Sequence, residues 1–325
     1  MKLKKINEKE LIAGIRKDFG SKSQETVELG ISDDAAVIKS GEKKIVLTKD
    51  LLIEDVHFIF SSHPPALLGR KSLCINLSDI AAMGCTPKYA LLGLGLPAKI
   101  KAEWVQEFFS GFKEASLEYN TALIGGDVTQ ADKVVISISL IGEGERYIRR
   151  GGAKPGDLLF VSGTLGDSAQ GLIMSKQGIG LGEGLNKDFL LRAFYDPVPR
   201  VPLGEKLAEQ NLASAMIDIS DGLSVDLGHI CEESSSGAEI ELNRIPISAE
   251  LSSVRENPLD LALHGGEDYQ LLFAVPPEKE KQVLNLFSKF KITKIGCFIS
   301  GKDIFIKGKN GTRKLMEIKG YQHFT

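Results

Sequence analysis

Short apolar runs rich in β-forming residues alternate with amphipathic runs along the whole of this 325-residue chain. The run 101–119 places Trp104, Phe108 and Phe112 at helical spacing, and 200–210 and 278–290 are amphipathic in the same way. This alternation is typical of α/β and α+β folds, although it does not fix the order of the strands. The strand-like runs lie at 43–50, 89–97, 133–143, 157–163, 214–220 and 269–276.

Length and one flexible segment predict two domains. A chain of 325 residues exceeds one typical domain and suits two. The Gly/Pro-rich segment RRGGAKPGD at 149–157 lies between two strand-like runs. We therefore expect an N-terminal domain over 1–148 and a C-terminal domain over 149–325.

The composition argues against several classes of protein. A net charge of −3 without Lys/Arg clusters gives no electrostatic basis for binding nucleic acid. No apolar run reaches the roughly 18 residues of a membrane span, and the charged start does not resemble a signal peptide. The four cysteines form no CxxC pair, which leaves zinc and redox sites without support. We expect a cytoplasmic protein with reduced thiols.

Aspartates recur at five places, at the ends of strand-like runs or beside small residues. In LIGGDVTQ (123–130) the apolar run is expected to end at two glycines, and Asp127 follows. A single aspartate at a turn is usually structural, because it caps a helix or closes an Asx-turn. IDISDGL, however, carries three polar residues where a cap needs one. The other four segments are GISDDAAVI (30–38), LTKD (47–50), NLSDIAAMG (76–84) and IDISDGL (217–223).

Carboxylates that converge need cations between them. Two unit charges 4 Å apart repel by about 4 kcal/mol at an effective dielectric of 20. Oxygen ligands without His or Cys suit Mg²⁺, Mn²⁺ or Ca²⁺, and the calcium-loop spacing is absent. A GxxxxGK[ST] loop is also absent. The residues by themselves therefore indicate a Mg²⁺ site that handles phosphate.

Six motifs in order carry a resemblance to a known family. They are GISDDAAVI, INLSDIAAMG, LIGGD, RRGGAKPGD, IDISDGLSVDLGHI and HGGEDYQLLF, followed by KGYQHF near the C-terminus. Together they resemble the thiamine-monophosphate kinases. Those enzymes share a superfamily with aminoimidazole ribonucleotide synthetase, selenophosphate synthetase and a hydrogenase maturation protein. The resemblance runs from about Glu28 to the C-terminus.

The resemblance implies a fold and a reaction. It implies an α/β (α+β) chain whose N-terminal mixed sheet forms a barrel-like interface in a homodimer, with a C-terminal α/β domain beside it. ATP and several Mg²⁺ ions would bind between the domains. The γ-phosphoryl group of ATP would pass in line to thiamine monophosphate, giving thiamine diphosphate. No general base is expected, because the second pKa of a phosphate monoester is about 6.

The resemblance also implies roles for individual residues, and two positions depart from the usual pattern. Lys49 stands where a small hydroxyl residue is usual, and Ser32 where glycine is commoner. His57 could instead be a packing residue, Glu267 a turn cap and Tyr321 a core anchor. The implied metal ligands are Asp34, Thr48, Lys49, Asp50, Asp79, Asp127, Asp218 and Asp221; the ATP contacts are Gly126, Asp127, Arg150 and Ser220; the substrate contacts are His57, Glu267 and Tyr321.

Other functions remain as alternatives. Ring closure of the aminoimidazole ribonucleotide type would use the same aspartates and ATP. Selenophosphate synthesis needs a reactive residue near the N-terminus, whereas the first cysteine here is Cys74. The hydrogenase protein needs a C-terminal cysteine, whereas this chain ends in QHFT. A regulatory nucleotide-binding protein without turnover would be expected to have lost metal ligands, and all six matched aspartates are present.

Overall fold

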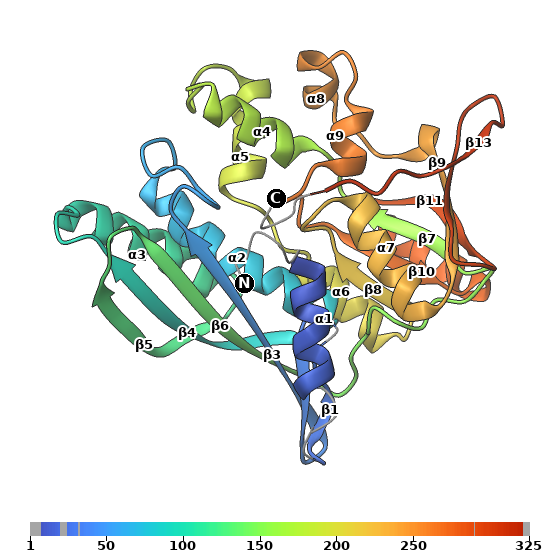
Figure 1. The fold of residues 1–325 in the computed structure, drawn as a ribbon, viewed down its shortest axis with the longest axis horizontal. Helices are drawn as coiled ribbons and strands as arrows, with labels where there is room; N and C mark the ends of the chain where they lie inside the picture. The colour runs from blue at the N-terminus through green and yellow to red at the C-terminus, as the bar shows by residue number, and fades with distance from the viewer. Residues whose placement is uncertain (1–7, 20–24, 32, 289, 321–325) are drawn as a thin grey trace.

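The structure is a computed structural model that describes residues 8–19, 25–31, 33–288 and 290–320. Its N-terminal part contains a six-stranded sheet in the order β1-β2-β3-β6-β4-β5 (Figure 1). The pair β4–β5 is parallel and the other neighbours are antiparallel. The bounds are β1 Val27–Leu29, β2 Ala36–Ser40, β3 Lys43–Ile53, β4 Thr86–Leu96, β5 Ala122–Gln130 and β6 Val135–Gly144.

The C-terminal part contains a seven-stranded sheet in the order β13-β12-β9-β11-β7-β10-β8. Here β9–β12 is the parallel pair. The expected two-domain α/β fold with mixed sheets is confirmed, whereas the barrel-like dimer sheet stays a prediction. The bounds are β7 Leu158–Ser162, β8 Ala215–Asp218, β9 Gly237–Glu241, β10 Leu271–Val275, β11 Ile292–Ile299, β12 Ile304–Lys307 and β13 Arg313–Leu315.

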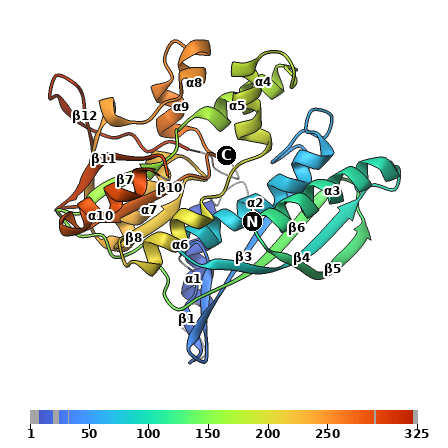
Figure 2. The same cartoon turned by 180° about the vertical axis from the view of Figure 1, so that it is seen from behind.

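Helices α2 and α3 cover one face of the first sheet, while the second sheet has α7 on one face and α2, α6 and α10 on the other (Figures 1 and 2). The amphipathic stretch 278–290 forms the short helix α10 with a 3₁₀ turn on each side, rather than one long helix. The helices are α1 Glu8–Phe19, α2 Pro65–Ala82, α3 Ala102–Glu118, α4 Asp167–Lys176, α5 Leu185–Tyr195, α6 Val201–Glu209, α7 Leu223–Ser234, α8 Ala249–Val254, α9 Leu259–His264 and α10 Glu280–Leu284; the 3₁₀ turns are η3 Leu242–Arg244, η4 Pro277–Lys279 and η5 Asn285–Ser288.

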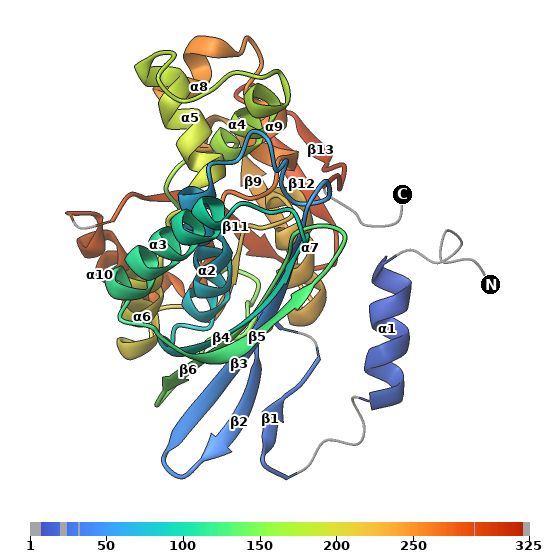
Figure 3. The ribbon, with the colours of Figure 1, turned by 90° about the vertical axis from the view of Figure 1, so that its left-hand side faces the viewer.

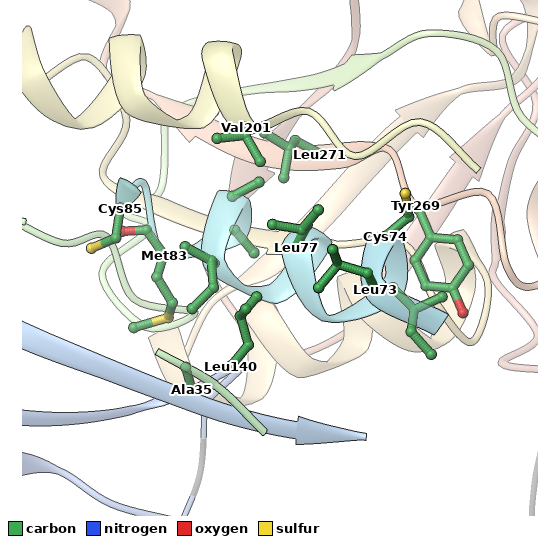
Figure 4. Packing of buried hydrophobic residues seen from close by; sticks show 14 of the residues in the cluster. Ala35, Leu73, Cys74, Leu77, Met83, Cys85, Leu140, Val201, Tyr269 and Leu271 are labelled. Carbon is green, nitrogen blue, oxygen red and sulfur yellow. The ribbon is translucent and has the colours of Figure 1, made fainter. Parts of the chain in front are cut away.

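The central helix α2 joins the two sheets. It begins at Pro65, whose fixed φ suits a first helical position. Its flanks pack on α3, α6, β3 and β8, so it is buried on nearly all sides. In Figure 4 its residues Leu73 and Leu77 lie in the same cluster as Tyr269 and Leu271 of the C-terminal part. Polar residues on this helix are therefore held inside the molecule, between the domains.

Two strands extend beyond their expected ends. Strand β3 continues past Asp50 to Ile53, and β5 runs through both glycines and Asp127 to Gln130. The pairing with β4 slips by one residue before Gly125, which is a β-bulge. A Cβ on Gly126, whose φ is +156°, would lie 1.9 Å from the carbonyl oxygen of Leu92. The glycines therefore shape a bulged strand instead of ending it.

The first sheet is curved, and its faces differ (Figure 3). Helices α2 and α3 cover one face, while α1 stands on the other side of the sheet. Arg16 of α1 forms an ion pair of 2.7 Å with Glu233 of α7. Among the described residues, none of the helices has the length and apolar character needed to cross a membrane.

Candidate functional site

Three carboxylates from separate elements meet where the domains face each other. Asp34 precedes β2, Asp79 lies in α2 and Asp218 ends β8. One oxygen from each lies within 4.8 Å of the others. Asp34 and Asp218 are 8% and 2% exposed, so bulk water screens their charges poorly. Sequence reasoning grouped these residues, and the fold brings them together.

Neighbouring side chains orient the three carboxylates and Asp50. The hydroxyl of Thr48 donates to Oδ2 of Asp79, and Ser78 Oγ donates to Oδ2 of Asp218 at 2.6 Å. Asn76 accepts from the backbone N–H of Asp50 at 3.2 Å through its Oδ1. Since α2 is buried, polar residues along one stretch of it face both β3 and β8. The sequence reasoning assigned no role to Asn76 and Ser78. The signal that could have found them is their polar character within an otherwise apolar helical run.

Burial and mutual repulsion raise the pKa values of these carboxyls. Burial, followed by the charge of Asp34, raises the pKa of Asp218 to about 8. Burial raises the pKa of Asp50 to about 6. Burial, with Asp50 and Asp218 nearby, raises the pKa of Asp79 well above its ordinary value. Buried carboxyl groups that repel one another in this way are stabilised when protons or metal cations bind among them.

Arg150 binds one side of Asp34 and leaves the other open. Its Nε and Nη2 donate to the same oxygen, Oδ1, at 3.2 and 2.6 Å. The second oxygen, Oδ2, is buried and has no hydrogen-bond partner among the residues that the structure describes. Asp33 accepts from the backbone N–H of Arg150 at 3.1 Å and so fixes the arginine's main chain. An orphaned carboxylate oxygen beside two further carboxylates fits a hard divalent cation such as Mg²⁺.

Asp226 of α7 holds the loop that follows β8. Its Oδ2 accepts the backbone N–H groups of Ser220, Asp221 and Gly222 at 3.1, 3.2 and 3.0 Å. Asp226 is 2% exposed, and burial raises its pKa well above the ordinary range. This residue was missing from the sequence prediction. Its place one helical turn after Gly222 is typical of a loop-fixing side chain, but not specific to one.

A cavity of about 820 Å³ opens beside the carboxylates. His57 lies on its wall, and the Nδ1 of His57 accepts from the backbone N–H of Ile53 at 3.0 Å. Glu267 adopts a left-handed φ of +64°, and its N–H donates to the carbonyl of Ser220 at 2.7 Å. The predicted site residues on the cavity wall are Lys49, Asp50, His57, Asp79, Asp218, Ser220, Asp221 and Glu267.

A second cavity, of about 660 Å³, lies at the segment between β6 and β7. Its wall includes Arg146, Arg149 and Ser214, and none of the predicted site residues that the structure describes lines it. The carboxylate cluster therefore distinguishes the first cavity as the candidate active site.

Gly126 and Asp127 lie apart from the cluster within one chain. Cross-strand register places Asp127 beside Gly93, Gly93 beside Ser137, and Ser137 beside Leu51 of β3. Three strand spacings, about 14 Å in all, therefore separate Asp127 from β3. These four residues lie on the face of the first sheet that α2 and α3 do not cover, which we call the uncovered face. Leu91, on the same face, is 40% exposed.

Lys49 also turns toward that uncovered face. Its Nζ donates to Ser137 Oγ at 2.6 Å, away from the contact between Thr48 and Asp79. If Lys49 contacts a metal ion, the contact would therefore come from its main chain and not from its side chain. Tyr321, the remaining predicted residue, lies outside the described residues.

Comparisons with known proteins place the chain in a family. The N-terminal domain of AIR synthase related protein matches residues 32–143, and the C-terminal domain matches 154–309. The thiamine-monophosphate kinase of Aquifex aeolicus is 38% identical over 331 residues, covering 100% of both chains. That of Bacillus subtilis is 37% identical, covering 92% of this chain and 94% of the relative.

A solved structure resembles this one over nearly its whole length. AaThiL complexed with AMPPCP and TMP superposes with a TM-score of 0.89 at 36% identity, covering 99% of each chain. The chain belongs to the AIR synthase related family and, within it, to the thiamine-monophosphate kinases.

Proposed function

We propose that this protein transfers the γ-phosphoryl group of ATP to thiamine monophosphate, giving thiamine diphosphate and ADP. The observation that carries the proposal is the cluster of Asp34, Asp79 and Asp218: two of its members, Asp79 and Asp218, line the cavity whose wall also carries Glu267 and His57. Carboxylates suited to binding phosphate through metal ions, and a glutamate suited to binding an organic cation, thus line the same cavity. The AMPPCP and TMP bound by the similar AaThiL supply the substrate classes.

The carboxylates fit several Mg²⁺ ions. Asp34, Asp79 and Asp218 would hold one group of ions, and Asp50 and Asp221 line the same cavity as Asp79 and Asp218. Bound there, Mg²⁺ would neutralise the charge that builds up when the phosphates of ATP and thiamine monophosphate approach each other. The orphaned Asp34 Oδ2 is the feature of this chain that most supports the assignment.

The chain's own residues orient the two substrates. Arg150 presents a guanidinium beside Asp34, where it suits a phosphate oxygen of ATP. The loop fixed by Asp226 holds Ser220 toward the same cavity. The Glu267 carboxylate favours the cationic thiazolium and aminopyrimidine end of the substrate. A general base is dispensable, because the attacking phosphate oxygen is already ionised near neutral pH.

The uncovered sheet face supports a homodimer. Strand β5 is an edge strand exposed along its whole length, and on the uncovered face beside it Leu51, Tyr89 and Leu91 are 45%, 48% and 40% exposed. An apolar edge of this kind is normally covered. A two-fold partner on this face would close the sheets into the barrel-like interface that the sequence predicts. The same contact would bring the partner's Asp127 toward β3, which explains its distance from the cluster in its own chain.

Mixed dimers test this arrangement. Asp79→Asn and Asp127→Asn chains are each expected to be inactive alone. Co-expressed at equal levels, they would recover about a quarter of the wild-type activity if chains pair at random, because one site in each mixed dimer is intact. No recovery, with mixed dimers present, would show that Asp127 acts within its own chain. Sedimentation of the wild type should give twice the 35.3 kDa chain mass, and Leu91→Arg, on the uncovered face, should shift the mass toward that of a single chain.

Two smaller proposals remain from the sequence. The domain boundary at 148/149 falls between β6 and β7. All four cysteines are free, which supports a reducing, cytoplasmic location.

Product analysis tests the function itself. The purified protein would be mixed with ATP, Mg²⁺ and thiamine monophosphate, with free thiamine in a parallel reaction. Equal amounts of thiamine diphosphate and ADP, from the monophosphate alone, are expected. If the protein turns over neither substrate, the kinase assignment is wrong, and ring-closing substrates of the superfamily become the next to assay.

A further inference from the structure

A lysine buried inside the molecule contacts the wall of the active-site cavity. The side chain of Lys71, in the middle of α2, has no exposed surface. Its Nζ donates to the carbonyl oxygen of Phe194 at 2.9 Å and lies 3.9 Å from the centre of that residue's ring. Full burial of a lysine is rare unless a carboxylate pairs with it.

The carboxylate that pairs with Lys71 is Glu267. Lys71 Nζ lies 3.1 Å from Oε1 of Glu267. The ends of the pair differ, because the lysine is fully buried while the glutamate side chain is 25% exposed and lines the cavity. The Lys71 ammonium therefore contacts Glu267 from the buried interior, and the partly exposed part of the Glu267 side chain faces the cavity.

The backbone around Glu267 is constrained as well. Glu267 and Tyr269 both have left-handed φ angles, +64° and +49°, which side-chain-bearing residues seldom adopt. Their N–H groups donate to the carbonyls of Ser220 and Ile219 at 2.7 and 2.8 Å. The segment that carries Glu267 is thus bonded to the loop that carries Ser220. Lys71 adds a third attachment, from α2, which also carries Asp79.

We propose that Lys71 is a positioning residue for substrate recognition: it holds Oε1 of Glu267 and leaves the second carboxylate oxygen to the cationic, amine-bearing end of thiamine monophosphate. This inference rests on the proposed function. A glutamate without this partner would be free to rotate into the cavity or toward the metal site. The fixed carboxylate gives the enzyme a preference for a positively charged substrate end at a set distance from the phosphates.

The adjacent residue Arg70 provides a matched control. It lies on the same helix and pairs with Asp196, after α5, at 2.8 Å and with Glu118 of α3 at 2.7 Å. Like Lys71, it connects α2 to the region of α5. Unlike Lys71, it forms no ion pair with Glu267 among the described residues, and like Lys71 it does not itself line the cavity. A purely structural role for Lys71 predicts similar effects for both substitutions.

The experiment measures thiamine monophosphate binding by calorimetry, without ATP, and steady-state KM values for both substrates. Lys71→Met should raise the Kd and KM for thiamine monophosphate by about ten- to a hundredfold and change the KM for ATP less than about twofold. Arg70→Met should lower the thermal midpoint and leave both KM values near wild type. Equal changes in the two KM values of Lys71→Met, or an unchanged Kd, would overturn the proposal.

A double-mutant cycle keeps the test decisive if Lys71→Met folds poorly. The double variant Lys71→Met/Glu267→Gln removes both charges of the pair. Proteins often tolerate the replacement of a buried ion pair by uncharged residues. If Lys71 acts through Glu267, the double variant should bind thiamine monophosphate within about twofold of Glu267→Gln alone. Additive losses would contradict the proposal. An inactive wild type would instead refute the proposed function, since calorimetry reports the Lys71 effect without turnover.

Discussion

Gly126 shows how a single position can have two explanations. Its place before Asp127 suggests close approach of a nucleotide phosphate. In the structure, a Cβ there would already lie 1.9 Å from the carbonyl oxygen of Leu92. The requirement for glycine therefore arises from strand pairing, whatever ligand binds beside it.

Substitution at the two glycines separates these explanations. Gly126→Ala should destabilise the fold by about 2–3 kcal/mol, because a main-chain oxygen must move. Gly125→Ala should change stability by less than about 1 kcal/mol, since its Cβ would meet only the end of Leu91 at 3.3 Å. Urea denaturation of both variants without ligands checks this. Equal stabilities would show that strand pairing does not dictate Gly126.

Element by element, the sequence predicted most of the fold and part of the site. Strands with strong apolar runs, such as β6, β7 and β10, were found because burial favours such runs. The ends of β3 and β5 were misplaced, because a bulge or an aspartate within a strand looks like a turn. Stretch 278–290 was amphipathic, yet it became α10 between two 3₁₀ turns, because periodicity does not distinguish one helix from several short turns.

The sequence predicted the site residues that lie in charged motifs. It did not predict those whose roles depend on contacts with residues far away in the chain. Asp34, Asp79 and Asp218 form one cluster, as the recurring aspartates suggested. The sequence assigned no functional role to Lys71 or Asp226, because their roles depend on Glu267 and on the loop after β8. Those partners come together only through packing of α2 and α7. A buried lysine looks like a surface one until the fold is known.

The loop after β8 gives a prediction at the scale of an element. Asp226→Ala leaves the N–H groups of Ser220, Asp221 and Gly222 without their acceptor, which should lower stability by about 1–3 kcal/mol. The loosened loop should also reduce turnover about tenfold or more. Asp226→Asn keeps an acceptor oxygen and resembles the protonated acid that the raised pKa favours, so it should retain most activity. Equal losses in the two variants would contradict the loop-fixing role.

For the whole molecule, the shared carboxylate site links stability to pH and metal. The pKa of Asp50 is raised to about 6, that of Asp33 to about 7 and that of Asp218 to about 8, in each case first of all by burial. Raised folded-state values mean that the native protein binds more protons than the unfolded chain above about pH 4. Stability from these groups is present at low pH and is lost as the pH rises through 6 to 8.

Thermal unfolding between pH 5.5 and 8.5 tests this linkage. Without metal, the midpoint should fall as the pH rises across this range. Mg²⁺ should raise the midpoint more at pH 8.5 than at pH 5.5, because it competes with protons for the same oxygens. A midpoint that rises with pH in the chelator-treated protein, or an effect of Mg²⁺ that is independent of pH, would contradict the electrostatic description.

The most direct measurement is the rate of thiamine diphosphate formation by Asp79→Asn, together with its metal-free thermal midpoint. We predict a loss of turnover of about a hundredfold or more, because the metal site loses a ligand. The midpoint should equal or exceed that of the wild type, because one of three mutually repelling carboxylates is gone. The exposed control Asp132→Asn should match the wild type in both measurements. Near-wild-type turnover in Asp79→Asn would contradict the assignment of this cluster as the phosphoryl-transfer site.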